Sequence, residues 1–267
     1  EIPKNMTQDQ KYIKAIYNGH LVEFYIMDKS PKAFLEKPEI SEEKKAELRW
    51  LYGDEKEDRT DSRRKQTLRD SSNQMRRLAT RNFPAGESLF MTLTYRSEEH
   101  LGFLDIDTAD KHFRSFIDTL REESEQHFKY IAVREFTKKG RIHFHLLTDF
   151  KIDGDDDIDL KRWERDVAKV WGHGFVDLAV TNPKNDNLGA YLAKYMSKDI
   201  GMEYFRGKKY YLCSQGLKRP EILTGAAALA LFEAMNKENE VFTNSYESEY
   251  LGNITYLEYN LKRFKIE

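Results

Sequence analysis

Two histidines in the stretch "REFTKKGRIHFHLLTDF", residues 134–150, have a spacing that suits metal binding. Successive side chains of a β-strand alternate between faces, so His143 and His145 share one face. Their backbone positions lie about 7 Å apart, twice the rise per residue, and both imidazoles can reach one ion. A short turn brings Glu135, on the preceding strand, back alongside them. This set predicts a site for Mn²⁺ or Mg²⁺ acting as a Lewis acid.

A second set of reactive side chains occurs in "GAYLAKYMSKD". On a helix, Tyr191 and Tyr195 are neighbours on one face, about 5–6 Å apart between Cβ atoms. Lys194 and Lys198 each follow a tyrosine by three residues. A nearby ammonium favours the ionised, nucleophilic form of a phenol and also offsets phosphate charge. Gly189 lets the start of this helix approach another segment closely.

Each set has a simpler explanation when it is taken alone. A His-x-His pattern on a strand arises by chance, with both rings satisfied by ordinary hydrogen bonds. A buried tyrosine pair accounts for the two phenols, although it accounts poorly for the interleaved lysines. Together the sets supply the parts for transesterification at a phosphodiester: an ion that polarises a phosphate oxygen and a tyrosine that displaces the 3′ oxygen.

Composition excludes several classes of protein. The chain has 34% charged and 13% aromatic residues among 267, which argues against a disordered tail. No apolar run approaches the roughly 20 residues that span a bilayer, and the first residues lack the apolar region of a signal peptide. The single cysteine, Cys213, excludes an internal disulfide and a Cys-pair zinc site. We therefore expect a cytoplasmic protein without a membrane partner.

The formal net charge of −2 hides local charge blocks. Residues 59–81 carry eight Arg or Lys against two Asp. Within them, Arg63, Arg64, Arg76 and Arg77 are candidate contacts to a DNA backbone. The alternative is a helix face that is simply solvated.

The elements that must position these residues predict an α+β fold. Residues 88 to 214 read as strand, helix, two strands joined by a short turn, helix, strand, helix, strand. Helices packed on an antiparallel or mixed sheet fit this order better than a doubly wound parallel sheet. Helices are expected at 108–124 with Thr108 as the cap, at 158–171, around the tyrosines with Asp186 or Asn187 near the cap, and at 222–236.

The ends of the chain form elaborations of this core. A hairpin is expected around Asn18-Gly19, a pair suited to a type I′ turn. Two strands are expected near 240–247 and 252–259. The predicted division is an N-terminal hairpin plus basic helix over 1–85, a core over 86–221, and a C-terminal segment over 222–267 that packs on the core.

The motifs of the core resemble those of the HUH (His-hydrophobic-His) endonucleases, specifically rolling-circle replication initiators (Rep proteins) of the two-tyrosine type from phages and bacterial plasmids. The similarity covers about 88–221. "FMTLTY" at 90–95 is similar to the family's first-strand motif, in which Thr92 and Thr94 are candidate DNA contacts. "HFH" is similar to its metal motif, "YLAKYMSK" to its double-tyrosine motif, and "YLCSQGLKRPE" to a downstream stretch.

This resemblance implies a five-stranded antiparallel sheet (HUH/RRM-like) with the histidines on a central strand and the tyrosine helix facing them. It implies single-stranded or hairpin origin DNA as substrate, with Glu135 as third metal ligand and both tyrosines as nucleophiles. The sequence has no G-x-x-x-x-G-K-[ST] motif, so unwinding would need a host helicase and replication machinery.

Two other functions fit the same residues. A conjugative relaxase or a transposase of the same superfamily would use identical chemistry in a different biological role. A non-catalytic module would bind single-stranded nucleic acid through sheet aromatics and basic side chains, and its histidine pair would be incidental.

Overall fold

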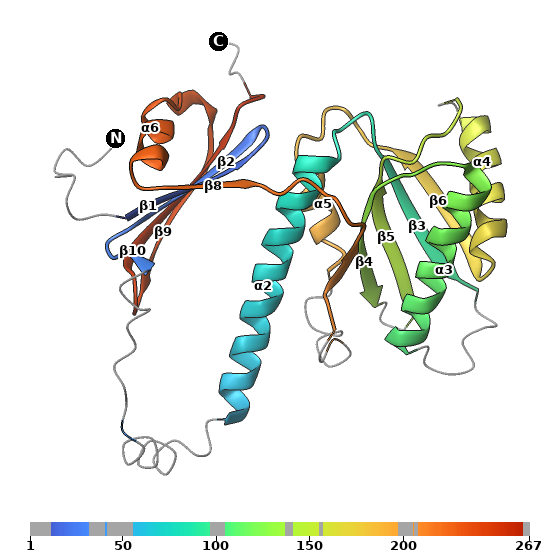
Figure 1. Ribbon diagram of the computed structural model, residues 1–267, viewed down its shortest axis with the longest axis horizontal. Coiled ribbons are helices and arrows are strands. Elements are labelled where there is room, and N and C mark those ends of the chain that lie inside the picture. The colour runs from blue at the N-terminus through green and yellow to red at the C-terminus, as the bar shows by residue number, and fades with distance from the viewer. Residues whose placement is uncertain are drawn as a thin grey trace. The chain divides into compact units, whose positions relative to one another are not determined.

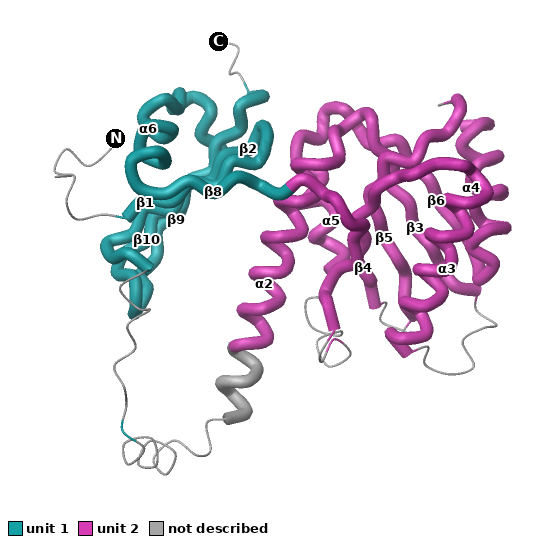
Figure 2. The backbone as a smooth tube through the Cα atoms, viewed as in Figure 1, with its two compact units in different colours: residues 1–61, 219–267 teal, residues 62–218 magenta. Residues whose placement is uncertain are grey.

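The computed structural model describes residues 12–31, 41, 56–96, 105–136, 141–154, 157–196, 205 and 208–263. The chain divides into two compact units (Figure 2). One unit consists of Glu1–Asp61 with Arg219–Glu267, and the other of Ser62–Lys218. Among the described helices, none combines the length and the apolar character that crossing a membrane requires.

The second unit is built on a five-stranded antiparallel sheet in the order β6-β3-β5-β4-β7. The predicted α+β class with a five-stranded antiparallel sheet is therefore confirmed. The strand with both histidines, β5, is the middle strand. The strands are β3 (Leu89–Tyr95), β4 (Tyr130–Phe136), β5 (Ile142–Thr148), β6 (Gly174–Val180) and β7 (Tyr211–Cys213).

Helices α3 (Ile106–Ser124) and α4 (Asp157–Trp171) lie along one side of this sheet (Figure 1). Alternation along the strands turns side chains such as Leu93 and Phe144 toward them, and both residues are fully buried. Phe113 of α3 stacks on Phe144 with ring centroids 4.7 Å apart. Burial of these apolar groups holds the sheet by one face and leaves the other face for the site.

Helix α3 begins earlier than predicted. Its N-cap is Asp105, whose carboxylate accepts hydrogen bonds from the Thr108 backbone N–H and hydroxyl, each at 2.9 Å. Thr108 was expected to be the cap, but it lies in the first turn. An aspartate three residues earlier satisfies a free backbone N–H and also favours the helix dipole, which explains the shift.

The other face of the sheet is packed by α2 (Lys56–Asn82) and α5 (Leu188–Ala193). Met75 and Leu78 of α2 contribute to this second core together with Leu192 of α5. A Cβ at Gly189 would collide with the backbone of α2 at Arg76. The close approach predicted for Gly189 is thus confirmed, and the segment it approaches is the basic helix.

The tyrosine helix is shorter than expected. Its cap is Asn187, one of the two predicted residues, and the Asn187 side chain accepts from the Ala190 N–H at 3.0 Å. Helix α5 ends at Ala193, and Tyr195 follows in a turn whose N–H bonds to Leu192 O at 3.1 Å. Such i→i+3 bonds tighten the last turn.

The first unit contains another five-stranded antiparallel sheet, in the order β8-β1-β2-β10-β9. Its hairpin is displaced by one residue from the prediction, because Asn18 pairs with Leu21 and positive φ is confined to Gly19 (φ 70). A type II′ turn has this pattern, with glycine first. The elements are β1 (Tyr12–Asn18), β2 (Leu21–Met27), β8 (Glu221–Thr224), α6 (Ala226–Glu233), η4 (Lys237–Asn239), β9 (Glu240–Ser248) and β10 (Gly252–Asn260).

The C-terminal segment extends the sheet of the N-terminal hairpin, a pairing that the predicted division of the chain did not contain. Strand β10 pairs with β2, and β8 pairs with β1. The expected helix over 222–236 therefore begins with a strand and becomes helical only after Gly225, where φ is +60. Leu257 and Tyr259 join Phe24 in a shared core, so burial of apolar surface drives this pairing.

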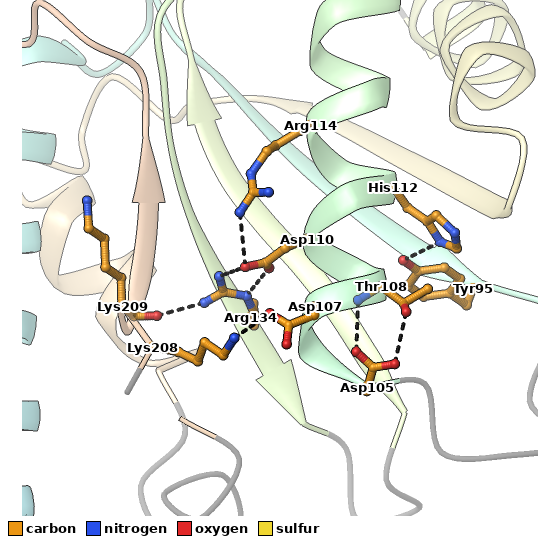
Figure 3. Close-up of polar contacts among 10 residues, drawn as sticks. All are labelled: Tyr95, Asp105, Asp107, Thr108, Asp110, His112, Arg114, Arg134, Lys208 and Lys209. Atoms are coloured by element: carbon orange, nitrogen blue, oxygen red, sulfur yellow. Dashed lines mark hydrogen bonds and ion pairs between the residues drawn. The ribbon is translucent and has the colours of Figure 1, made fainter. Parts of the chain in front are cut away.

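A buried ion pair ties α3 to β4 (Figure 3). Arg134 donates from Nε and Nη2 to the two carboxylate oxygens of Asp110, each at 2.6 Å, and from Nη1 to Lys209 O at 2.9 Å. The Arg134 side chain is 1% exposed. The adjacent residue on β4 is Glu135, so this bidentate contact helps to hold the strand that carries a candidate metal ligand.

We expect Asp110→Ala to destabilise the protein by about 3–5 kcal/mol, because it leaves the Arg134 charge buried and unpaired. Urea unfolding followed by circular dichroism measures this. Asp107→Ala is the matched control on the same helix, since the exposed Asp107 pairs with Lys208 at the surface, and we expect a change of about 1 kcal/mol or less. Equal effects of the two substitutions would contradict the role of the buried pair.

Candidate metal and tyrosine site

The pairing of β4 with β5 places Glu135 directly opposite His143. Opposite residues of an antiparallel pair point to the same face, and His145 lies two residues further along that face. The ligand atoms of the three side chains all lie within 4.8 Å of one another. Ligands of a single ion lie about 3–4.5 Å apart, so small side-chain movements close the set. Glu135, His143 and His145 therefore form a candidate metal site.

His145 is held at both ring nitrogens. Its Nε2 lies 2.7 Å from Glu135 Oε2, and its Nδ1 lies 3.1 Å from the Thr92 hydroxyl. Burial lowers the pKa of His145, although the Glu135 carboxylate opposes this shift. The neutral imidazole that a metal requires is thus favoured at neutral pH.

The tyrosines lie directly against this site. The Tyr195 ring stacks on the His145 ring with centroids 3.8 Å apart. The Tyr195 hydroxyl donates to the Tyr191 hydroxyl at 3.1 Å. The metal ligands and the two phenols, which the sequence presents as separate sets, are therefore parts of one site.

Phe90 is a member of the site that sequence reasoning missed. Its ring contacts those of His145, Tyr191 and Tyr195, with centroid distances of 5.9, 5.1 and 5.7 Å. It lies on β3 two residues before Thr92 and hence on the same face. That spacing was the available signal, but an apolar residue in a strand gives no sign of which helix will cover it.

The environment of the phenols differs from the predicted one. Burial, followed by the hydrogen bond with Tyr191, raises the pKa of Tyr195 to about 12 in the protein alone. Lys194 Nζ lies over the Tyr191 ring, 5.3 Å from its centroid, as a cation–π contact. The expected effect of a lysine on the neighbouring phenol is thus absent for Tyr195 within the described residues. Lys198 lies outside the described residues.

The candidate DNA contacts lie on two elements of the same unit. Arg63 is exposed on α2, whereas Arg64, Arg76 and Arg77 are partly buried there. Thr92 and Thr94 are partly buried on β3, opposite His145 and His143 respectively. The hydroxyl of Thr92 is engaged by His145, so it orients a candidate ligand. The DNA contacts of all six residues stay predictions.

Comparisons with known proteins concern the same segment of the chain. Residues 88–200 match the family model of the replication-associated protein ORF2. The chain is also similar to the Phasyl DNA replicon protein arp of Escherichia coli, with 29% identity over 138 residues. This match covers 44% of the chain and 46% of that protein, so the chain spans less than half of the relative's length. No solved structure matches. Both similarities support a replication-initiator family for the segment that carries the site.

We expect the full chain to bind one Mn²⁺ ion and His143→Ala to weaken binding by more than about 100-fold, since outer-shell changes alone cost roughly 10–100-fold. Isothermal titration calorimetry measures both affinities. Wild-type affinity should fall as the pH drops below about 6.5, because protons compete for the imidazoles. The lowered pKa of His145 moves the proton competition at that ring to still lower pH.

The matched control is His127→Ala, which removes an exposed histidine that is not part of the ligand set. Unchanged Mn²⁺ affinity is expected for this variant. If His143→Ala and His127→Ala bind Mn²⁺ equally well, the three side chains do not form the metal site.

Proposed function

We propose that the chain is a replication initiator that nicks single-stranded DNA at an origin by metal-assisted tyrosine transesterification. It would later rejoin the ends in rolling-circle replication. The observation that carries this proposal is the stacking of Tyr195 on His145, which brings a phenol pair against a candidate metal site. The similarity of residues 88–200 to replication-associated proteins supports the same biological role.

In the proposed step, a tyrosine hydroxyl oxygen attacks the phosphorus of one phosphodiester. A bond forms between that oxygen and phosphorus, while the bond from phosphorus to the 3′ oxygen breaks. The phenol loses its proton, and the departing 3′ oxygen gains one. The 5′ phosphate stays linked to the protein, and attack by a DNA 3′-hydroxyl reverses the step without a nucleotide cofactor.

Glu135, His143 and His145 would hold the divalent ion, Mn²⁺ or Mg²⁺. When bound, this ion supplies a Lewis acid for a phosphate oxygen and offsets charge in the transition state. The chain's own contribution is orientation: the Thr92 hydroxyl holds one ring nitrogen of His145, and the Tyr195 ring packs on the same imidazole. A metal ligand and a nucleophile are thereby held together before DNA arrives.

Two adjacent phenols give the protein two places to hold a DNA end. The hydroxyls of Tyr191 and Tyr195 are 3.1 Å apart, so both can approach one phosphate in turn. One would nick the origin and the other would cleave the regenerated junction after one round of synthesis. The positive charge of Lys194, over the Tyr191 ring, would offset the negative charge of a phosphate there.

We expect a covalent protein–DNA adduct when the chain is incubated with Mn²⁺ and a labelled single-stranded origin hairpin. The hairpin is sought in the DNA that flanks the gene. A denaturing gel detects the adduct, EDTA should abolish it, and the double variant Tyr191→Phe/Tyr195→Phe should form none. An adduct that persists in the double variant would refute the assignment of the nucleophiles.

A matched control for the phenols is Tyr250→Phe, because Tyr250 is a 63% exposed tyrosine in the other unit. We expect this variant to form the adduct at the wild-type rate. DNA binding without any cleavage by the wild-type protein would favour the non-catalytic binding module.

We also expect the basic helix α2 to contact the DNA backbone. Binding to single strands weakens with salt by a slope of about 0.7 per phosphate contact, so Arg63→Glu/Arg64→Glu should reduce the slope by about 1.4 or more. Fluorescence anisotropy at several salt concentrations measures the slope. These two arginines are chosen because Arg76 lies at the backbone contact with Gly189.

The control for this charge change is Lys161→Glu/Lys169→Glu on α4, where both side chains are more than 70% exposed. It changes the net charge by the same amount on a helix that packs on the other face of the sheet. A slope that falls equally in both double variants would mean that α2 has no specific role.

A further inference from the structure

Phe175 is a large apolar side chain that the core does not use. It lies on the edge strand β6 and is 68% exposed, whereas its neighbours Val176 and Leu178 are buried against the helices of the opposite face. No aromatic ring of the described residues packs against it. Single exposed apolar residues are common on protein surfaces, so its position relative to the candidate site decides its meaning.

The strand register places Phe175 in line with the metal ligands. It pairs with Thr94, Thr94 pairs with His143, and His143 pairs with Glu135. Partners across an antiparallel sheet share a face, so all four side chains project to the same side. Two strand spacings, about 10 Å, separate Phe175 from His143, a distance that an extended single strand spans in roughly one or two nucleotides.

Burial shows that this row is the open side of the site. Phe175 is exposed, and Thr94, His143 and Glu135 are each partly exposed. In the parallel row two pairs further along, Phe90 and its partner Leu147 are buried beneath α2 and α5. A DNA strand that reaches the metal ligands therefore meets the row of Phe175 and not the covered one.

The backbone holds Phe175 rigidly. A Cβ at Gly174 would collide with Thr94 O, so glycine permits the close approach of β6 to β3 at this position. The indole Nε1 of Trp171 donates to the same Thr94 oxygen at 3.2 Å, and Arg96 N donates to His173 O at 2.9 Å. A ring on such a fixed strand loses little further freedom when it binds a ligand.

The chemistry of this edge fits a nucleobase better than a phosphate. Asp177 is exposed two residues from Phe175 on the same face of β6. Its carboxylate repels phosphate oxygens but leaves the neutral face of a base unaffected. Stacking of a base on an aromatic ring tolerates any base, since every base has a π-face.

We propose that Phe175 is a stacking platform for one base of the single-stranded DNA, about one or two nucleotides from the phosphate at the metal ligands. Phe175 would act as a positioning residue that sets the register of the strand on the sheet. This inference rests on the proposed function, because it takes DNA to be the substrate of the same site.

The test compares two ligands in the absence of metal, by fluorescence anisotropy with the full chain. One is a labelled oligothymidylate of about 20 nucleotides, and the other is an abasic deoxyribose-phosphate strand of the same length. We expect Phe175→Ala to bind the oligothymidylate about 5-fold or more weakly and the abasic strand as tightly as wild type. Its salt slope should not change, unlike that of the Arg63→Glu/Arg64→Glu variant.

Two further variants separate stacking from a structural role. Phe175→Trp should restore the wild-type affinity for oligothymidylate, because it keeps an aromatic ring. Val180→Ala, at a 41% exposed position on the same strand, should not alter it. Equal binding of oligothymidylate by Phe175→Ala and wild type would overturn the inference, as would an equal loss on both strands. If the adduct still forms in either case, the proposed function stands; if wild type binds neither strand, both fail.

Discussion

The antiparallel pairing of β4 with β5 is the constraint on which the site depends. It sets Glu135 opposite His143 and leaves His145 two residues further along the same face. Because side chains alternate with a period of two, a slip by one residue would turn the ligands of one strand toward α3 and α4. The apolar residues that alternate with the histidines, such as Phe144 at full burial, oppose that slip.

The two faces of this sheet have different tasks. One face is closed by α3 and α4, and the buried contact of Arg134 with Asp110 and Lys209 O fastens β4 to that side. The other face is half covered by α2 and α5. Gly189 allows α5 to lie directly on α2, so the phenols and the basic helix belong to one packed layer. A rigid sheet thereby presents its candidate ligands beside a layer that carries both phenols and positive charge.

Burial has opposite consequences for the two kinds of reactive group. It lowers the pKa of His145, which favours the neutral ring that a metal needs. It raises the pKa of Tyr195 to about 12, which keeps that phenol protonated in the protein alone. Nucleophilic attack therefore requires a change that DNA and a divalent ion would bring, since nearby positive charge favours the phenolate. This dependence would couple the reactivity of the tyrosines to occupation of the site.

The sequence by itself determined the α+β class, the face shared by His143 and His145, and the return of Glu135 to that face, because strand periodicity and a short turn are local properties. It also indicated that Gly189 approaches another segment. Only the tertiary structure decided that this segment is α2, that α5 ends before Tyr195, and that the C-terminal strands complete the sheet of the N-terminal hairpin. Those outcomes depend on which apolar faces bury one another, and contacts between residues distant in the chain leave no local pattern.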